Sequence, residues 1–480
     1  MLYNKAPLFL WSVSYFVSLC VIGSNLSYLL ASLCFFLILY ILLRDIKQTM
    51  FFMFIINIPF ARGKLIEFVI ISKNEIPFGL FDVGYYFPLY ISTVFLVGTL
   101  FLIFRDKSNL WKIANVRIVL IGFCFFLIAC CIPLFYTKFP FVIGLSVIQL
   151  MLMGCVYTLP FWLYLTRSAL SRINHILAAF IVFEAGWIMT QALHRGPLGR
   201  YLEAILPLNR TGILSTEDAG FMRYNGTFYE PSILGTFMLM HVFFFIYLLI
   251  QNRYRTQAER NIYIFAAVSA MTSIIFTGSR GIYFLFILLS IYLFRTRIIF
   301  RVKKFTTTTT PRAFLLSIIA VLLFFSPYYV TRLQTVPALV SFLFSGQGSG
   351  AYRAQLDTLA YRLAEVNPFG VGLNLSPYYF VIGFPQDRTV DPAHPHNIFF
   401  QLLAETGGIG LTAFLLFLWL IYRQYMIRRS SSAEPYFMAS VIFIFCAQLY
   451  PIFISQPEIL TFFFLHAGLM NWSLHQPNHE

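Results

Sequence analysis

Charged residues are scarce in this chain. They make up 11% of its 480 residues, whereas hydrophobic residues make up 59% and aromatic residues 19%. A soluble domain cannot be built from this composition, because it would lack the polar surface that keeps a protein dissolved. The chain is therefore predicted to lie in a membrane.

The sequence also lacks the alternation of apolar and polar residues that a membrane β-barrel requires. Its apolar stretches are continuous and long enough to cross a bilayer as helices, as in Val83 to Phe104. The first stretch, Pro7 to Ile22, has no small-residue cleavage site and is predicted to remain as a helix. We expect an all-α, polytopic membrane bundle of about 12 to 14 transmembrane helices, with two long external loops that form a cap.

Motifs for disulfides and metals are absent. All seven cysteines lie inside apolar stretches, which indicates packing rather than a disulfide framework or a zinc module. No Asp-x-Asp motif occurs, which argues against a metal-dependent nucleotide-sugar transferase. The sequence predicts neither a metal nor a cofactor.

Six loops carry most of the basic residues. They hold 20 of the 34 Lys and Arg residues and three acids, so their net charge of +17 exceeds the +15 of the whole chain. The positive-inside rule predicts that these loops and both termini are cytoplasmic, and the basic charge then needs no nucleic-acid partner. The loops are Arg44–Met50, Arg105–Arg117, Arg167–Arg172, Gln251–Arg260, Arg295–Arg312 and Arg423–Arg429.

Two segments on the opposite, external side are far longer than a loop between two helices needs to be. They are His194–Glu230 and Thr331–His396. Shorter external segments are Ala61–Asp82, Thr137–Phe139 and the turn Gly278–Gly281. The predicted organisation is N-terminal transmembrane helices (1–193), an external loop (194–230), central helices with the Arg280 turn (231–330), a large external loop (331–396) and C-terminal helices (397–480).

Lysine is absent from the two long external segments and the turn, although these segments contain nine arginines. A guanidinium presents a planar fork of donors that suits phosphate oxygens, so we expect an anion such as a phosphate or pyrophosphate headgroup on this side. The alternative is a set of solvated arginines or contacts to anionic lipid. The arginines are Arg195, Arg200, Arg210, Arg223, Arg280, Arg332, Arg353, Arg362 and Arg388.

Two short motifs accompany these arginines. Thr277-Gly278-Ser279-Arg280-Gly281 joins two apolar helices, which places Arg280 near the outer surface, where snorkelling to the interface is its simplest explanation. Arg223 to Ser232 runs into a helix, with Pro231 suited to the first helical position and Glu230 beside the positive helix end. Glu230 is either a dipole-stabilising residue or a partner for Arg223 or Arg280.

Asp391-Pro392-Ala393-His394-Pro395-His396-Asn397 ends the second long segment. A neutral imidazole there can accept a proton from a hydroxyl. The alternatives are a metal site of Asp391, His394 and His396, or an interfacial cap without chemistry. Glu184 and Glu405 lie within apolar helices, where an ionisable group indicates either function or a structural hydrogen bond.

The stretch His394 to Leu411 resembles the hallmark of the O-antigen ligase and Wzy-type polysaccharide polymerase superfamily. The ligase pattern is a His, then Asn, Ser or Gln, nine residues, Gly, two residues, and Gly, Thr or Tyr. His396, Asn397, Gly407 and Gly410 meet this spacing. Arg353, Arg362 and Asn367–Gly372, together with Arg223–Ser232 and Thr277–Gly281, are similar to the family's other external regions.

The resemblance implies a catalytic histidine and essential arginines on the periplasmic side of the bacterial inner membrane. It makes His396 the base and Arg223 and Arg280 the pyrophosphate-binding arginines, with no metal. Further candidates for substrate contact are Arg353, which competes with Arg362, and Glu230, Tyr229, Asn397 and His394.

The implied donor is an undecaprenyl-pyrophosphate-linked oligosaccharide. The acceptor is a second lipid-linked repeat unit in a polymerase, which Phe228–Ser232 favours, or the lipid A core in a ligase, which the His396 to Gly410 match favours. A chain-length regulator and membrane lipid are candidate partners. Because no carboxylate nucleophile stands out, inversion at the anomeric carbon is expected. The rivals are a lipid-linked glycan transporter and a structural assembly protein.

Overall fold

The computed structural model describes most of the predicted transmembrane helices and part of the segments that were predicted to be external. The described residues are 6–19, 25–58, 64–71, 85–105, 114–163, 165–196, 198, 223–228, 230–293, 349–383, 394–450 and 457–475. Predictions for residues 199–222, 294–348 and 384–393 lie outside them.

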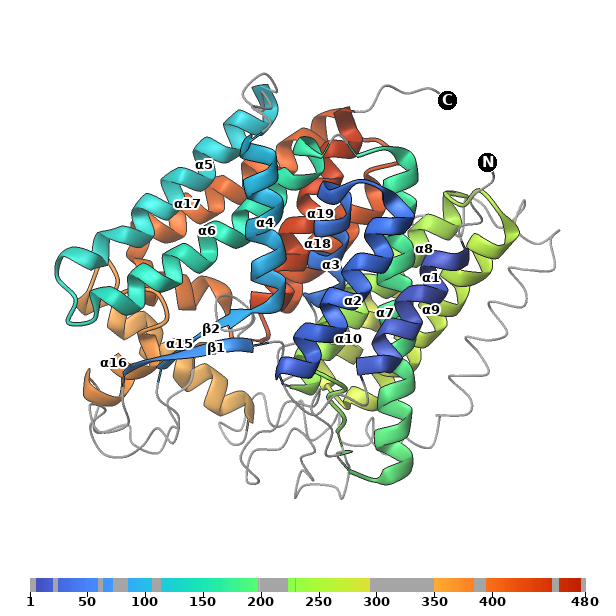
Figure 1. The fold of residues 1–480 in the computed structure, drawn as a ribbon. Helices are drawn as coiled ribbons and strands as arrows, with labels where there is room; N and C mark the ends of the chain where they lie inside the picture. Colours follow the sequence, from blue (N-terminus) through green and yellow to red (C-terminus); the bar gives the residue numbers. More distant parts are fainter. Residues whose placement is uncertain are drawn as a thin grey trace.

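The described residues form a bundle of helices (Figure 1). The N-terminal helices are α1 (Ala6–Leu19), α2 (Asn25–Leu43), α3 (Ile46–Asn57), α4 (Ile91–Arg105), α5 (Ala114–Cys131), the 3-10 helix η4 (Ile132–Phe135), α6 (Pro140–Trp162) and α7 (Arg167–His194). After them come α8 (Pro231–Ile250), α9 (Gln257–Thr277), α10 (Arg280–Leu293), α15 (Ser349–Val366), α16 (Ser376–Gly383), α17 (Ile398–Arg428), α18 (Glu434–Cys446) and α19 (Pro457–His475).

The predicted all-α membrane fold is confirmed. In the described part, six helices are long and apolar enough to cross a membrane, and five shorter helices are apolar. Two helices form the centre: every residue of α19 from Pro457 to Leu474 is buried, and α8 is buried on all sides over most of its length. A helix that is apolar all round needs protein on every side, which explains this position.

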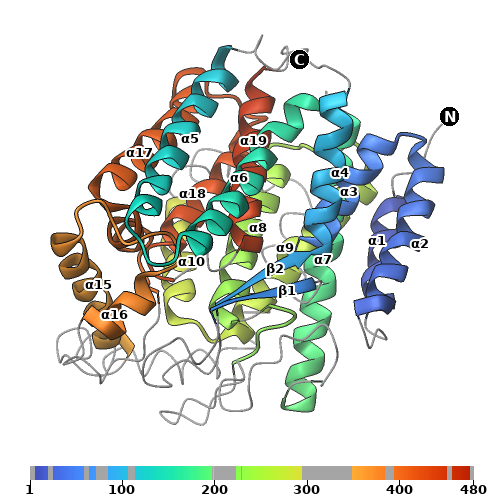
Figure 2. The ribbon, with the colours of Figure 1, turned by 60° about the vertical axis from the view of Figure 1, so that its left-hand side comes forward.

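Two opposite ends of the bundle differ in what they carry (Figures 1 and 2). At one end lie α15 and α16 with two short antiparallel strands, β1 (Lys64–Ile71) and β2 (Tyr85–Tyr90), which composition did not predict. We call this the cap end. At the other lie the connection between α8 and α9 and the C-terminus of α17, both predicted to be basic loops, so we call it the basic end.

Several helix boundaries lie next to the segments that were predicted to be external. Helix α7 ends at His194 and α8 begins at Pro231, with Glu230 as its N-cap. Helix α9 ends before the Gly278 turn, and α10 begins at Arg280. All of these boundaries lie at the cap end (Figure 2).

Helix α17 breaks at Gly407, where φ is 68° and ψ is −175°. This combination is available almost only to glycine. A loop carrying Gly370 docks into the break: Val371 N donates to Ala404 O (3.0 Å), Gly372 N to Glu405 O (2.8 Å) and Gly408 N to Pro368 O (3.3 Å). The motif glycines therefore permit two backbones to pack together, since a Cβ at Gly407 would lie 2.1 Å from Pro368 O.

Candidate functional site

The segment 223–228 lies along the C-terminal end of α9. Tyr224 N donates to Phe276 O (3.1 Å), and the Nε of Arg223 donates to Thr277 O (3.1 Å). The Gly278 turn and the Arg223 motif, which are far apart in the sequence, are thus joined directly.

Helix α7 fixes the same segment from its other side. Gln191 exchanges two hydrogen bonds with the backbone of Gly226, from Nε2 to Gly226 O (3.2 Å) and from Gly226 N to Oε1 (3.1 Å). Glu184 accepts from the backbone N (3.1 Å) and the hydroxyl of Thr227. Glu184 was expected to have either a functional role or a structural hydrogen bond. The structure shows structural hydrogen bonds, because the buried carboxyl group holds the loop that carries Arg223.

Arg223 lies close to the arginine of another segment. Burial lowers the pKa of Arg223, and the charge of Arg353 lowers it further, while Tyr450, Glu230 and Tyr283 oppose the shift. One cation lowers the pKa of another in this way only when the two are near each other in a poorly solvated place. Among the described residues, neither arginine has a carboxylate within ion-pair distance.

Arg353 lies on the inner side of α15 with its guanidinium over the ring of Tyr450, Cζ being 5.3 Å from the ring centroid. Arg362 is nine residues further along, which is about half a turn away around a helix, and it is exposed. Arg353 and Arg362 were alternative candidates for the same substrate contact. Of the two, Arg353 is the one that lies in this cluster. Burial raises the pKa of Asp357, one turn along α15, to about 6, against the charge of Arg353.

His396 is half-buried in front of α17 and makes a T-shaped contact with the ring of Tyr352, with 6.3 Å between the ring centroids. Burial and then Arg353 lower its pKa to about 3, opposed by a hydrogen bond to the Leu449 backbone. Its Nδ1 has no hydrogen-bond partner among the described residues. A neutral imidazole with a free ring nitrogen therefore lies beside an arginine.

His394 has a different environment, although it is two residues away. Its Nδ1 lies 3.2 Å from Oε1 of the buried Glu405 and 3.3 Å from Nε2 of Gln401. Ser376 donates to the same carboxylate oxygen (2.7 Å). Glu405 therefore pairs with His394, and Ser376 and Gln401, which the sequence did not single out, complete the cluster.

The segment 447–450 after α18 completes the site, and sequence reasoning missed it. Ala447 O accepts from Ile398 N (2.9 Å), the first residue of α17. Leu449 holds His396, and Tyr450 lies beneath Arg353. The segment contains no ionisable motif apart from one tyrosine in an aromatic-rich chain, so no sequence signal pointed to it.

The remaining predicted residues have varied positions. Asn397 caps α17 by accepting from Phe399 N (2.9 Å), and Glu230 accepts from the hydroxyl of Ser232 (3.0 Å). Arg280 begins α10, but its side chain lies outside the described residues, as do Tyr229 and Asp391. Within the described part, no three His, Cys, Asp or Glu side chains gather as a metal site would require.

A polytopic helical membrane protein thus presents two arginines and a neutral histidine at the cap end, drawn from three separate segments. Residues 264–415 match the family model Wzy_C, described as O-Antigen ligase, and this confirms the resemblance predicted from the motifs. The match includes Arg280, Arg353 and His396, and it supports a glycan ligase or polymerase role in general. No curated protein matches the chain.

Proposed function

We propose that this protein transfers a glycan from an undecaprenyl-pyrophosphate carrier to an acceptor sugar hydroxyl at the cap end, on the periplasmic face of the bacterial inner membrane. The observation that carries the proposal is the meeting of Arg223, Arg353 and His396 without an ion-pair partner in the described residues. Two guanidiniums whose donors are not used by carboxylates suit the oxygens of a pyrophosphate.

In the proposed reaction, the bond between the anomeric carbon and the pyrophosphate oxygen breaks, and the electron pair leaves with the pyrophosphate. Arg223 and Arg353 stabilise the growing charge, an electrostatic term that is often the largest in catalysis. Arg280 begins the helix next to them and is assigned the same role. The acceptor oxygen attacks from the opposite side, so the configuration inverts.

His396 takes the proton of the acceptor hydroxyl. Its lowered pKa keeps it neutral at physiological pH, which leaves a lone pair to accept a hydrogen bond. A bound pyrophosphate would offset the charge of Arg353, and this makes His396 a stronger base when the donor is present. Substrate binding thereby raises the basicity of His396.

Within this class, we favour a polymerase that adds lipid-linked repeat units to one another, because Phe228–Ser232 resembles that branch. A ligase to the lipid A core is the second candidate, favoured by the motif from His396 to Gly410. A transporter would place cations along a central path, whereas α15, which contains Arg353, and the start of α8, which follows Arg223 in the sequence, are at one end of the bundle (Figure 2).

The test compares purified wild type and His396→Ala, each incubated without added metal with an undecaprenyl-pyrophosphate-linked repeat unit, with and without lipid A core. Removal of the base is expected to lower the transfer rate by about 10² to 10⁴ without changing the melting temperature in detergent. A ladder of longer glycans from the wild type identifies a polymerase, and transfer only with core identifies a ligase. Transfer that does not depend on His396 contradicts the mechanism.

A further inference from the structure

Tyr450 lies where the parts of the site meet, outside the segment that matches the O-antigen ligase family model. It follows α18, and only 3% of its surface is exposed. Its backbone N donates to Cys446 O (3.1 Å), which continues the helical turn and fixes the direction of the side chain. The mechanism above assigns this residue no role.

The two ends of the Tyr450 side chain make different contacts. The ring faces the guanidinium of Arg353, with 5.3 Å from Cζ to the ring centroid. The hydroxyl makes a 2.5 Å hydrogen bond with the hydroxyl of Ser279. Ser279 belongs to the Gly278 turn and immediately precedes Arg280, so one side chain connects α15 with the turn between α9 and α10.

The space around the hydroxyl admits little movement. A Cβ at Gly281 would lie 2.6 Å from the Tyr450 oxygen, which explains why glycine follows Arg280 in the motif. Arg223 is tied to the same turn through its bond to Thr277 O. Both described arginines of the site are therefore connected to the turn. Arg223 contacts it directly, and Arg353 contacts it through Tyr450.

We propose that Tyr450 is a positioning residue that fixes the Arg353 guanidinium relative to the Thr277–Gly281 turn, so that the arginines bind one pyrophosphate in a single geometry. This inference rests on the proposed function. A face-on aromatic ring restrains a guanidinium without using its N–H donors, which a carboxylate partner would occupy. The ring thus holds Arg353 in place and leaves its donors to the substrate.

The experiment uses full-length Tyr450→Phe, Ser279→Ala and the double variant. Each single change removes the same hydrogen bond, so each is expected to weaken binding of undecaprenyl pyrophosphate and to lower kcat by about tenfold. The double variant should lose no more than either single variant, because the bond can be lost only once. Tyr450→Leu also removes the ring and is expected to lose about a hundredfold.

Tyr436→Phe is the matched control. Tyr436 lies in the first turn of α18, near the basic end, is as buried as Tyr450, and donates to Asn174 of α7 (3.3 Å). Loss of this hydrogen bond should lower the melting temperature without changing kcat or Kd. A structural role for Tyr450 would give the same pattern. Wild-type binding and turnover in Tyr450→Phe would overturn the inference and leave the proposed function intact.

The binding arm separates the two proposals. If the wild type transfers no glycan but binds undecaprenyl pyrophosphate in a manner that depends on Tyr450, the positioning role stands and the transfer reaction falls. If the wild type neither binds nor transfers, both are overturned.

Discussion

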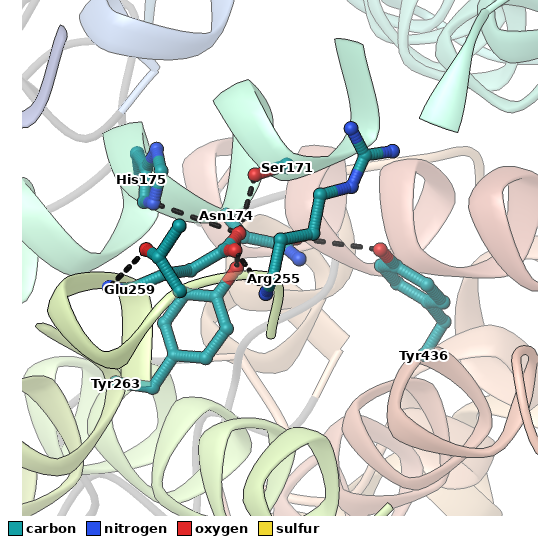
Figure 3. Close-up of polar contacts among 8 residues, drawn as sticks. Ser171, Asn174, His175, Arg255, Glu259, Tyr263 and Tyr436 are labelled. Atoms are coloured by element: carbon teal, nitrogen blue, oxygen red, sulfur yellow. Dashed lines mark hydrogen bonds and ion pairs between the residues drawn. The ribbon is translucent and has the colours of Figure 1, made fainter. Parts of the chain in front are cut away.

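Two clusters of buried polar residues, one at each end of the bundle, are built in opposite ways. Figure 3 shows the cluster at the basic end, where α7, α9 and α18 meet around Glu259. There, Oε1 accepts from Ser171 (2.5 Å) and Tyr263 (2.9 Å), and Oε2 accepts from Arg255 N (2.7 Å). His175 lies 3.7 Å from the same carboxylate.

At the cap end, by contrast, Arg223 and Arg353 repel each other, and the Nδ1 of His396 has no partner among the described residues. A buried carboxylate with every oxygen bonded is a structural joint, because its desolvation is compensated within the protein. Cations held near each other without an ion-pair partner in the described residues favour an anion from outside. The contrast distinguishes a cluster that supports the fold from a candidate binding site.

The largest expected effect on stability is at the basic end. Glu259→Leu removes the acceptor of Arg255 N and of the buried hydroxyls of Ser171 and Tyr263, and it should lower the free energy of unfolding by about 4 kcal/mol. Arg353→Leu should change stability little and abolish transfer. Both quantities are measured in the same detergent, with Glu365→Leu on the exposed side of α15 as the control. Equal stability losses at the two ends would remove the contrast.

A smaller effect is expected at the break in α17. Gly407→Ala forces a side chain into a backbone conformation with φ of 68° and against Pro368 O, and it should cost about 3 kcal/mol. Gly408→Ala is the matched control, because a Cβ there meets nothing within 4 Å and the helix gains a better helix former. Thermal unfolding of both variants checks this, and equal melting temperatures would contradict the role given to the break.

The smallest expected effect sharpens the electrostatics of the cap end. Arg353→Gln removes a cation that lowers the pKa of His396, so that pKa should rise from about 3 by about one unit. Burial would still hold it below its ordinary value. The neutral ring is the active form. As the pH is lowered, the residual activity of the variant should therefore disappear at a higher pH than the activity of the wild type. NMR titration of the labelled histidine measures the shift directly, and an unchanged pKa would show that Arg353 does not act on His396.

Some features could be predicted from residue patterns. The spacing from His396 to Gly410 indicated the family that the model over residues 264–415 matches, because such a motif can be read along the chain without knowledge of the fold. The roles of Glu184 and Glu405 could not be chosen, since each depends on a partner distant in sequence, Thr227 and His394. The choice between Arg353 and Arg362 likewise needed the direction in which α15 faces.

Composition and order of residues alone determined that this protein is a helical membrane bundle, because the bilayer requires internally satisfied backbones. Only the tertiary structure decided that 447–450 completes the site, that Tyr450 joins Arg353 to the Ser279 turn, and that Gly407 admits a docking loop. These facts are contacts between segments far apart in the chain, and such contacts are set by packing, which no local pattern of residues encodes.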